Sequence, residues 1–256
     1  MVTVAIAGGG SAIASNIINA ILATKKHQLV ILSRSPRPEL EAQGAIVKVV
    51  DYDSHEQLTN ALRGVHTVLS CIWTYGPTVG TLQIALLEAA KEAKAKEPVW
   101  EAVKKSGLEY TRFINGLWMN VWAPGAPRDE EVARAGYKGP AFLLDINSGS
   151  ITIPGDGNGI ISVTDMRDVG KYAAAALDFE KWDEDSVIVG DKVTINELVE
   201  KIEKITGKKL DKSYVSLDAI DAVIAGEYDL TPNVNERVPE VKPLKVDEFL
   251  ATHWTA

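Results

Sequence analysis

The sequence predicts an α/β protein built on a parallel β-sheet that helices cover on both faces. Short apolar runs alternate with segments of helical periodicity through the first half of the chain. These runs are apolar throughout and do not alternate with polar residues, which is typical of strands buried on both sides. A glycine triplet at residues 8–10 follows the first run and precedes the first helical segment. Together the three observations favour a doubly wound sheet.

The expected elements of the first half follow from these local patterns. In helix 13–23 the apolar residues share one face, whereas the run at 2–7 is continuous and short enough for a buried strand. The remaining elements are expected as strands over 29–32, 45–50, 66–72 and 110–115, and as helices over 38–43, 58–62, 79–93 and 97–105. Repeated strand–helix units of this kind place the strands parallel.

One interval breaks the alternation. No apolar run lies between Ala93 and Glu97, although a doubly wound sheet places a strand between two successive helices. Either the sheet has one strand fewer than usual, or some residues of the parent protein are absent from this sequence. The sequence alone leaves both alternatives open.

The second half is less regular. Proline and glycine between 123 and 139 predict a loop that could cover a site. Strands over 150–153 and 159–163 flank Asp156-Gly157-Asn158-Gly159, so a β-hairpin is expected there. Thr164 or Asp165 is expected to cap the next helix, and 187–190 to form a short strand.

A further helix is expected between a capping box and a terminal glycine. Thr194 and Glu197 have the spacing of the box, in which the first side chain caps the helix and the second reaches back to it. Apolar residues behind them keep helical spacing as far as Gly207, where the helix should end.

Composition excludes several classes of function. The net charge of −8 argues against sequence-independent nucleic-acid binding, which needs a cationic face. The single cysteine, Cys71, excludes an intrachain disulfide and fits a reducing compartment. The opening residues lack a signal-peptide pattern, and no apolar run approaches the roughly 20 residues that span a bilayer. We therefore expect a cytoplasmic protein without a membrane partner, and the scattered histidines predict no metal site.

The glycine-rich segment is the most informative motif. Glycines between a strand and a helix let the backbone approach a diphosphate, which the N–H groups at the helix start can hold. The spacing is similar to G-x-x-G-x-x-G beginning at Gly8, with Ser11 and Ala14 in place of the later glycines. The segment predicts a Rossmann-type dinucleotide-binding turn, and a tight turn without a ligand is the alternative. The expected binding residues are Gly8, Gly10, Ser11, Ala12 and Ile13.

The residues after the second expected strand indicate which dinucleotide binds. Ser33 and Arg34 stand where an acidic residue would bind the adenosine ribose of NAD. An arginine suits the 2′-phosphate of NADP, so NADP(H) is favoured over NAD(H), although a simple solvated arginine is the alternative. By their positions after the third and fourth strands, Asp51 is expected near the adenine, and Ile72 with Trp73 near the middle of the cofactor.

Several longer motifs carry a family resemblance. They are VWEAVKKSGLEYT at 99–111, NGLWM at 115–119, GDGN at 155–158 and TDMRDVG at 164–170, together with the glycine segment and Ser33-Arg34. With them the sequence resembles, over nearly its whole length, the NmrA-like and isoflavone-reductase-like branch of the atypical short-chain dehydrogenases. In that family a strand and a long loop that shapes the substrate pocket usually lie where this chain passes from Ala93 to Glu97.

The resemblance implies a fold and two alternative functions. The fold would be a Rossmann-type doubly wound parallel sheet over 1–122 and a smaller C-terminal α+β substrate lobe over 123–256, interleaved with the core. Enzymes of the branch prefer NADP(H) and reduce small aromatic or phenylpropanoid-type molecules. NmrA-type members instead bind the dinucleotide without evident turnover and regulate a protein partner.

The candidate catalytic residue is Lys96. None of the seven tyrosines has a lysine four residues later, so the common Tyr-x-x-x-Lys site is disfavoured. The resemblance implies a lysine ahead of the segment that contains Tyr110, and Lys96 matches that place best. It would hold the nicotinamide ribose and act as general acid. Alternatively Lys91, Lys94 and Lys96 form a solvated helix face.

The substrate pocket is expected after the strand at 110–115. Asn115, Trp118 and Trp122 should lie near its carboxyl end, where open α/β sheets bind ligands. The two tryptophans could line an aromatic pocket or form the core face of a helix. We therefore expect a reductase of a small aromatic or unsaturated carbonyl substrate, with a dinucleotide-sensing regulator as the alternative. The sequence is compatible with a homodimer or a protein partner.

Overall fold

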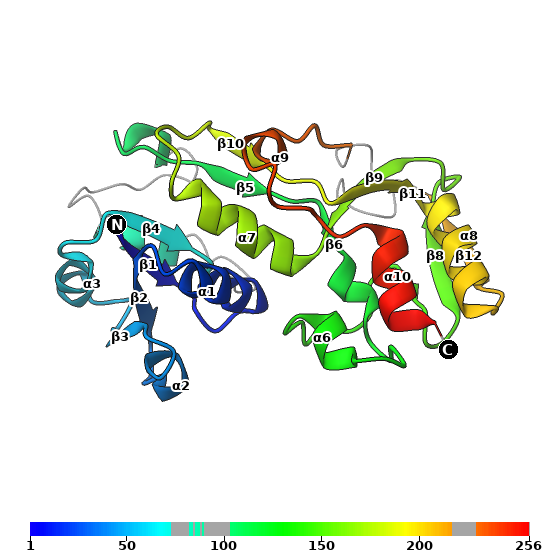
Figure 1. Cartoon of the computed structure of the whole chain (residues 1–256), viewed down its shortest axis with the longest axis horizontal. Helices are drawn as coiled ribbons and strands as arrows, with labels where there is room; N and C mark the ends of the chain where they lie inside the picture. Colours follow the sequence, from blue (N-terminus) through cyan, green and yellow to red (C-terminus); the bar gives the residue numbers. More distant parts are fainter. Residues whose placement is uncertain (73–81, 84, 88, 90–102, 217–228, 256) are drawn as a thin grey trace. The chain divides into compact units, whose positions relative to one another are not determined.

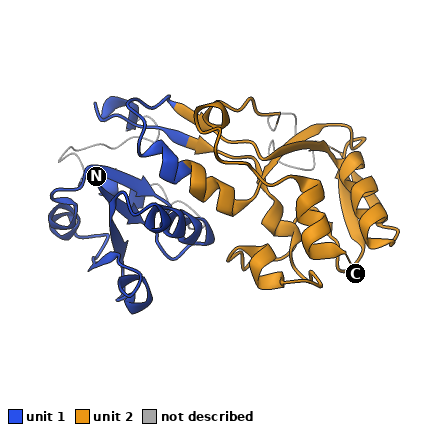
Figure 2. Ribbon diagram, in the orientation of Figure 1, with its two compact units in different colours: residues 1–112, 173–184 blue, residues 113–172, 185–256 orange. Residues whose placement is uncertain are grey.

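The computed structural model describes residues 1–72, 82–83, 85–87, 89, 103–216 and 229–255 (Figure 1). The chain forms two compact units, one of residues 1–112 and 173–184, the other of residues 113–172 and 185–256 (Figure 2). The boundary expected after residue 122 falls inside the second unit. The interval between Ala93 and Glu97 lies outside the described residues, as do most of the helices expected on either side of it.

The first unit contains a parallel sheet of four strands. Their order is β3 (Ile46–Val49), β2 (Gln28–Ser33), β1 (Thr3–Ala7) and β4 (Thr67–Ser70). The helices in the connections are α1 (Ala12–Thr24), α2 (Pro38–Glu41) and α3 (His55–Leu62). Figure 1 shows α1 and α3 on opposite faces of the sheet. The predicted Rossmann-type doubly wound sheet is thereby confirmed.

Burial explains why these strands are apolar on both faces. On one face of β1 and β2, Ala5 and Leu32 belong to a cluster that includes the α3 residues Leu58, Ala61 and Leu62. The isoleucines of α1 that share one side of that helix, Ile17, Ile18 and Ile21, are buried as well. A strand covered by a helix on each face has no position for a polar residue that water could reach.

The second unit is built from short strands and two contacting helices. One sheet has the order β11 (Asp191–Thr194), β9 (Ile160–Thr164), β6 (Leu117–Trp118); another has the order β12 (Asp211–Val215), β8 (Ser150–Pro154), β7 (Leu144–Asp145). Strands β5 (Arg112–Ile114) and β10 (Asp185–Val187) pair with each other. Helices α8 (Ile195–Thr206) and α10 (Val246–Trp254) contact each other and contribute to one apolar core. The remaining helical elements are η1 (Met119–Trp122), α6 (Glu130–Arg134), α7 (Met166–Ala176) and α9 (Val234–Arg237). Residues 173–176 of α7 belong to the first unit.

The prediction of a β-hairpin around Gly157 is wrong. Strand β8 pairs with β7 and β12, whereas β9 pairs with β6 and β11, so the two strands belong to different sheets. Helix α8 holds the intervening turn: Asn196 Nδ2 donates to the Asp156 carbonyl at 3.0 Å, and the Asn196 amide donates to the Gly157 carbonyl at 3.1 Å. The Asp-Gly-Asn-Gly chemistry makes a turn as predicted, but partners from elsewhere in the chain decide where each strand goes.

Helix ends follow the local sequence more closely. The predicted capping box at Thr194 and Glu197 is present, with both reciprocal hydrogen bonds, and α8 ends at Gly207 with φ +67°. A short helix, α6, forms inside the loop expected over 123–139, so that part of the prediction is wrong. Among the described residues, no helix combines the length and the apolar character needed to cross a lipid bilayer.

A buried polar network holds the start of α7. Asp165, 1% exposed, accepts the Arg167 amide at 2.8 Å and so takes the predicted capping role. The Arg167 guanidinium also binds both carboxylate oxygens at 2.7 Å. Asn120 donates to Asp165 Oδ2 at 3.0 Å and accepts the Met166 amide at 2.8 Å. Burial alone would raise the pKa of Asp165, but the hydrogen bonds and charge of Arg167 outweigh it, so the pKa lies below its usual value.

Candidate dinucleotide-binding site

The turn between β1 and α1 needs glycine at its first position. Gly8 has φ +77°, and a Cβ there would stand 2.6 Å from the carbonyl carbon and oxygen of Cys71. Cys71 follows β4, and its amide donates to the Ala7 carbonyl at 2.9 Å, so the two chain segments are tied together. Only a residue without a side chain fits between them. The turn therefore places residues 8–11 at the carboxyl ends of parallel strands, where open α/β sheets bind ligands.

The N-terminus of α1 presents two unused amides. A helix start leaves four N–H groups without an intrahelical partner. In α1 two of them have acceptors: the Ser11 amide donates to the Gly8 carbonyl and the Ala14 amide donates to Ser11 Oγ, both at 3.2 Å. The other two belong to Ala12 and Ile13, and within the described part of the chain no acceptor faces them. Ser11 thus acts as the helix cap, while Ala12 and Ile13 leave donors available for a diphosphate.

Tyr52 supports the glycine turn from the end of β3, a role that sequence reasoning missed. Its hydroxyl donates to the Leu32 carbonyl at 3.1 Å and accepts the Gly8 amide at 3.4 Å. Burial of this phenol, which is 9% exposed, raises the pKa of Tyr52 in spite of the Gly8 hydrogen bond and the charge of Arg34. Tyr52 therefore stays protonated and links the ends of β1 and β2. Its neighbour Asp51, expected near the adenine, is exposed and accepts the Asp53 amide.

Two arginines follow β2. Ser33 is buried and its hydroxyl accepts the Ser35 amide at 3.3 Å, which turns the chain after the strand. Arg34 is exposed, and its charge acts on the Tyr52 phenol. Arg37, which the sequence reasoning did not single out, lies against the glycine turn: its Nη2 is 2.9 Å from the position that a Cβ on Gly10 would occupy. The sequence signal that could have identified Arg37 is its position three residues after Arg34.

Of the remaining predicted residues, Ile72 lies beside the glycine turn, since its backbone nitrogen is 2.8 Å from the position that a Cβ on Gly8 would occupy. Ile72 is half-buried, and its carbonyl accepts Gln83 Nε2 at 3.2 Å. Trp73 and Lys96 fall outside the described residues. Asn115, Trp118 and Trp122 belong to the second unit. Trp122 is 1% exposed within its core, against which Trp118 packs. The indole N–H groups of both tryptophans are buried without an acceptor among the described residues.

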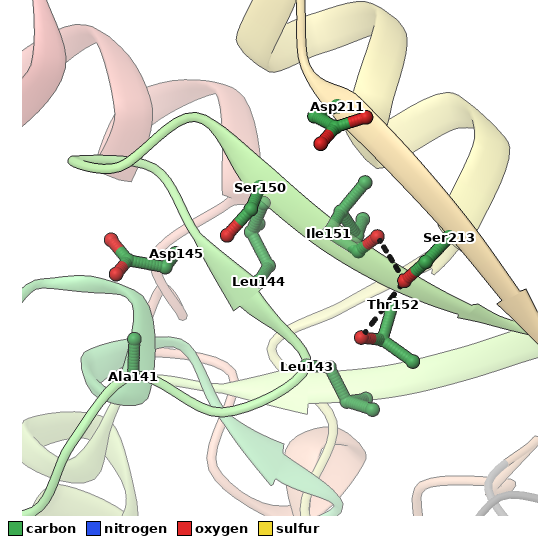
Figure 3. A pocket seen from close by; sticks show the side chains of 9 residues that line it. All are labelled: Ala141, Leu143, Leu144, Asp145, Ser150, Ile151, Thr152, Asp211 and Ser213. Carbon is green, nitrogen blue, oxygen red and sulfur yellow. Dashed lines mark hydrogen bonds between the residues drawn. The ribbon is translucent and has the colours of Figure 1, made fainter.

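The second unit also has a surface hollow of about 270 Å³ along β7, β8 and β12 (Figure 3). The carboxylates of Asp145 and Asp211 and the hydroxyls of Ser150, Thr152 and Ser213 line it. Much of this polarity is already satisfied, because Ser213 Oγ bonds the Ile151 carbonyl at 3.2 Å and Asp145 accepts the Ser148 amide at 3.0 Å. None of the predicted site residues lines the hollow. Within the described ranges, no group of three or more His, Cys, Asp or Glu side chains is placed to hold a metal ion.

A parallel sheet with a glycine turn at its carboxyl edge and unused helix-terminal amides defines a dinucleotide-binding protein of Rossmann type. Comparison by sequence agrees, because residues 8–126 match a family model described as NAD(P)H-binding. Oxidoreductase BOA1 of Botryotinia fuckeliana (strain B05.10) is 29% identical over 239 residues, which cover 82% of this chain and 77% of the relative. The bifunctional pinoresinol-lariciresinol reductase of Thuja plicata is 24% identical over 264 residues, which cover 87% of this chain and 81% of that protein.

Solved structures give the same result for the fold. A structure from a study of pinoresinol-lariciresinol and phenylcoumaran benzylic ether reductases superposes with a TM-score of 0.79 at 20% identity, covering 98% of this chain and 99% of that one. AtPrR2 with NADP+ and (+)pinoresinol superposes with a TM-score of 0.74 at 21% identity, covering 98% of each chain. The chain thus carries an NAD(P)H-binding domain, has the fold of the isoflavone-reductase-like proteins and has oxidoreductases among its relatives. The resemblance stated from the sequence is confirmed.

Proposed function

We propose that the protein is an NADP(H)-dependent reductase of a small aromatic or unsaturated carbonyl-type substrate. The observation that carries this proposal is the glycine turn, where the amides of Ala12 and Ile13 are unused and Arg34 follows the next strand. When bound, the cofactor would supply the hydride. The chain would hold its diphosphate at residues 8–13. The single cysteine fits a reducing compartment, so we place the reaction in the cytoplasm.

The preference for NADP(H) is tested at Arg34. Replacing Arg34 by alanine removes a cation from the expected position of the 2′-phosphate and should weaken NADPH binding by about 1–3 kcal/mol, as for a lost charged hydrogen bond. NADH, which has no such phosphate, should bind as before. Arg63→Ala is the matched control, because Arg63 is exposed and stands before β4, at the opposite edge of the sheet. Calorimetric titration of the three proteins with both cofactors measures the difference, and an equal loss for NADPH and NADH would contradict the assignment.

The assignment of residues to the substrate side rests on the sequence and on the family resemblance. We assign Lys96 as the general acid and Asn115 and Trp118 to the substrate pocket; Trp122, expected there from the sequence, is 1% exposed in the core of the second unit. Two relatives support an aromatic substrate by their names, the pinoresinol-lariciresinol reductase of Thuja plicata and the phenylcoumaran benzylic ether reductase PT1 of Pinus taeda. Consumption of NADPH would be measured against aldehydes, enones and phenylpropanoids. Lys96→Ala should lose activity, Lys91→Ala on the same charged segment should keep it, and full activity of Lys96→Ala would remove the assignment.

A second candidate is a dinucleotide-sensing regulator that binds a protein partner and does not turn over. One observation favours it: no tyrosine in the chain is followed four residues later by lysine, so the common short-chain dehydrogenase pair is missing. Tight binding of NADPH without oxidation across the whole panel would favour the regulator. Measurable oxidation of the cofactor by any member of the panel would favour the reductase.

A further inference from the structure

The Arg167 guanidinium is held along one edge and unused along the other. Its Nε donates to Asp165 Oδ1 and its Nη2 donates to Asp165 Oδ2, both at 2.7 Å. Among the described residues, no acceptor faces Nη1 or the second N–H of Nη2. The Arg167 side chain is 34% exposed, whereas that of Asp165 is 1% exposed. The unused edge is therefore the one that solvent reaches.

Asp165 and Arg167 follow a pair of parallel strands. Strands β6 and β9 run parallel with Trp118 opposite Thr164 at their carboxyl ends, and Asp165 comes directly after β9. Asn120, which is fully buried just after β6, donates to Asp165 Oδ2 at 3.0 Å. The guanidinium is thus positioned beyond the carboxyl ends of two parallel strands of the second unit, the place where α/β proteins bind ligands.

Arg134, in the same unit, offers a comparison. Its Nε donates to Glu130 Oε1 at 2.7 Å. Its Nη1 donates to the carbonyls of Tyr137 at 3.4 Å and Gly139 at 3.5 Å. Both Nε and Nη1 of Arg134 therefore have acceptors from the protein. Arg167 has the same kind of carboxylate anchor, but its Nη1 has no acceptor in the part of the chain that the structure describes, which leaves the outer edge available for a ligand.

The anchor prepares this outer edge for an anion. A buried carboxylate is costly without a partner, so Asp165 fixes the guanidinium before any ligand binds. An arginine that is already fixed loses little conformational freedom on binding. Its outer edge presents two parallel N–H groups in one plane, which match the two oxygens of a carboxylate.

The surrounding charges favour a monoanion. The carboxylates of Asp165 and Asp168 both act on the Arg167 guanidinium, and Asp168 is paired with Lys171 at 2.6 Å. Both aspartates are buried, 1% and 2% exposed. Two carboxylates this close to the cation repel a dianionic phosphate more strongly than a singly charged carboxylate.

We infer that Arg167 anchors a binding site for the carboxylate of a small organic acid, through Nη1 and the outer N–H of Nη2. Asp165 and Asn120 are positioning residues, which hold the guanidinium and do not touch the ligand. The inference goes beyond the proposed reduction. It requires neither cofactor nor turnover, because the glycine turn belongs to the other unit.

The test follows the arginine side chains of the isotope-labelled, full-length protein by NMR. The Nε–H signal of Arg167, assigned from through-bond spectra, is recorded during titration with acetate, benzoate, neutral benzamide and inorganic phosphate at constant ionic strength. Acetate and benzoate should shift this signal saturably, and benzamide, which lacks the charge, should leave it in place. The signal of Arg134, whose Nε also binds a carboxylate, should not move.

Arg167→Lys supplies a second measurement. Lysine keeps a cation beside Asp165 but lacks the planar fork that binds two carboxylates at once. Calorimetry should show benzoate binding weakened by about 10-fold or more, as for lost charge-assisted hydrogen bonds. Arg134→Lys, the matched control, should bind benzoate as the wild type does. An unchanged affinity in a folded Arg167→Lys overturns the inference, and if that variant is unstable the wild-type titration decides.

Three results of the titration would overturn the inference. A signal of Arg167 that shifts with neither acetate nor benzoate removes the site. Equal shifts at Arg167 and Arg134 reduce it to a general effect of salt. Inorganic phosphate that binds more tightly than benzoate contradicts the carboxylate class. All three leave the NADP(H) assignment standing, because that assignment is tested separately by cofactor binding.

Discussion

Gly8→Ala should destabilise the first unit far more than the same substitution at Gly64. Both glycines have nearly the same left-handed backbone, with φ +77° at Gly8 and φ +76° at Gly64. An alanine in this region costs about 1–2 kcal/mol at either position. At Gly64 nothing lies within 4 Å of the new Cβ, whereas at Gly8 it would stand 2.6 Å from the Cys71 carbonyl. Relieving that overlap adds about 1–3 kcal/mol, so we expect a total of about 2–5 kcal/mol for Gly8→Ala.

Urea unfolding followed by far-ultraviolet circular dichroism measures both variants against wild type. The comparison isolates the packing contribution, because the two glycines belong to the same unit and share the conformational cost. The backbone at Cys71 cannot simply retreat, since its amide is bonded to the Ala7 carbonyl. Gly8→Ala should also weaken NADPH and NADH alike, as the turn carries the diphosphate and not the 2′-phosphate. Equal free energies of unfolding for the two variants would refute the reasoning.

Three further outcomes are expected. Tyr52→Phe removes the hydroxyl that bonds the Leu32 carbonyl and should lower the free energy of unfolding by about 1–2 kcal/mol, measured by urea unfolding; an unchanged value would mean that the bond contributes nothing. Thr194→Ala removes the α8 cap and should cost about 0.5–2 kcal/mol, while a substitution without effect would deny the capping box its role. Because the pKa of Asp165 is lower in the folded than in the unfolded protein, its ionised form stabilises the fold at pH values above the ordinary pKa of an aspartate. This stabilisation is lost as the pH falls through the folded-state pKa. Arg167→Gln should therefore shift acid unfolding, followed by tryptophan fluorescence, to higher pH; a shift to lower pH would contradict this sign.

Local patterns in the sequence were sufficient for much of the first unit. The uniformly apolar runs at 2–7 and 29–32 become adjacent parallel strands, because a strand covered on both faces excludes polar residues. The box at Thr194 and Glu197 is a contact between residues three apart, so it depends on no distant partner. The glycine turn was equally visible, since only glycine tolerates both the backbone conformation and the close approach at residue 8.

Other features depend on residues far apart in the chain. The turn at Gly157 has hairpin chemistry, yet β8 and β9 enter different sheets because their partners come from distant segments. The support that Tyr52 gives to Gly8 joins residues 44 positions apart, and no local signal marks it.

The sequence by itself determined the apolar strands, the glycine turn and the arginines after the second strand, because each is encoded by neighbouring residues. The tertiary structure alone decided which strands pair, which amides at the start of α1 stay unused and which arginine lies against Gly10. The physical reason is that pairing and proximity are set by packing over the whole unit, where burial outweighs local preference.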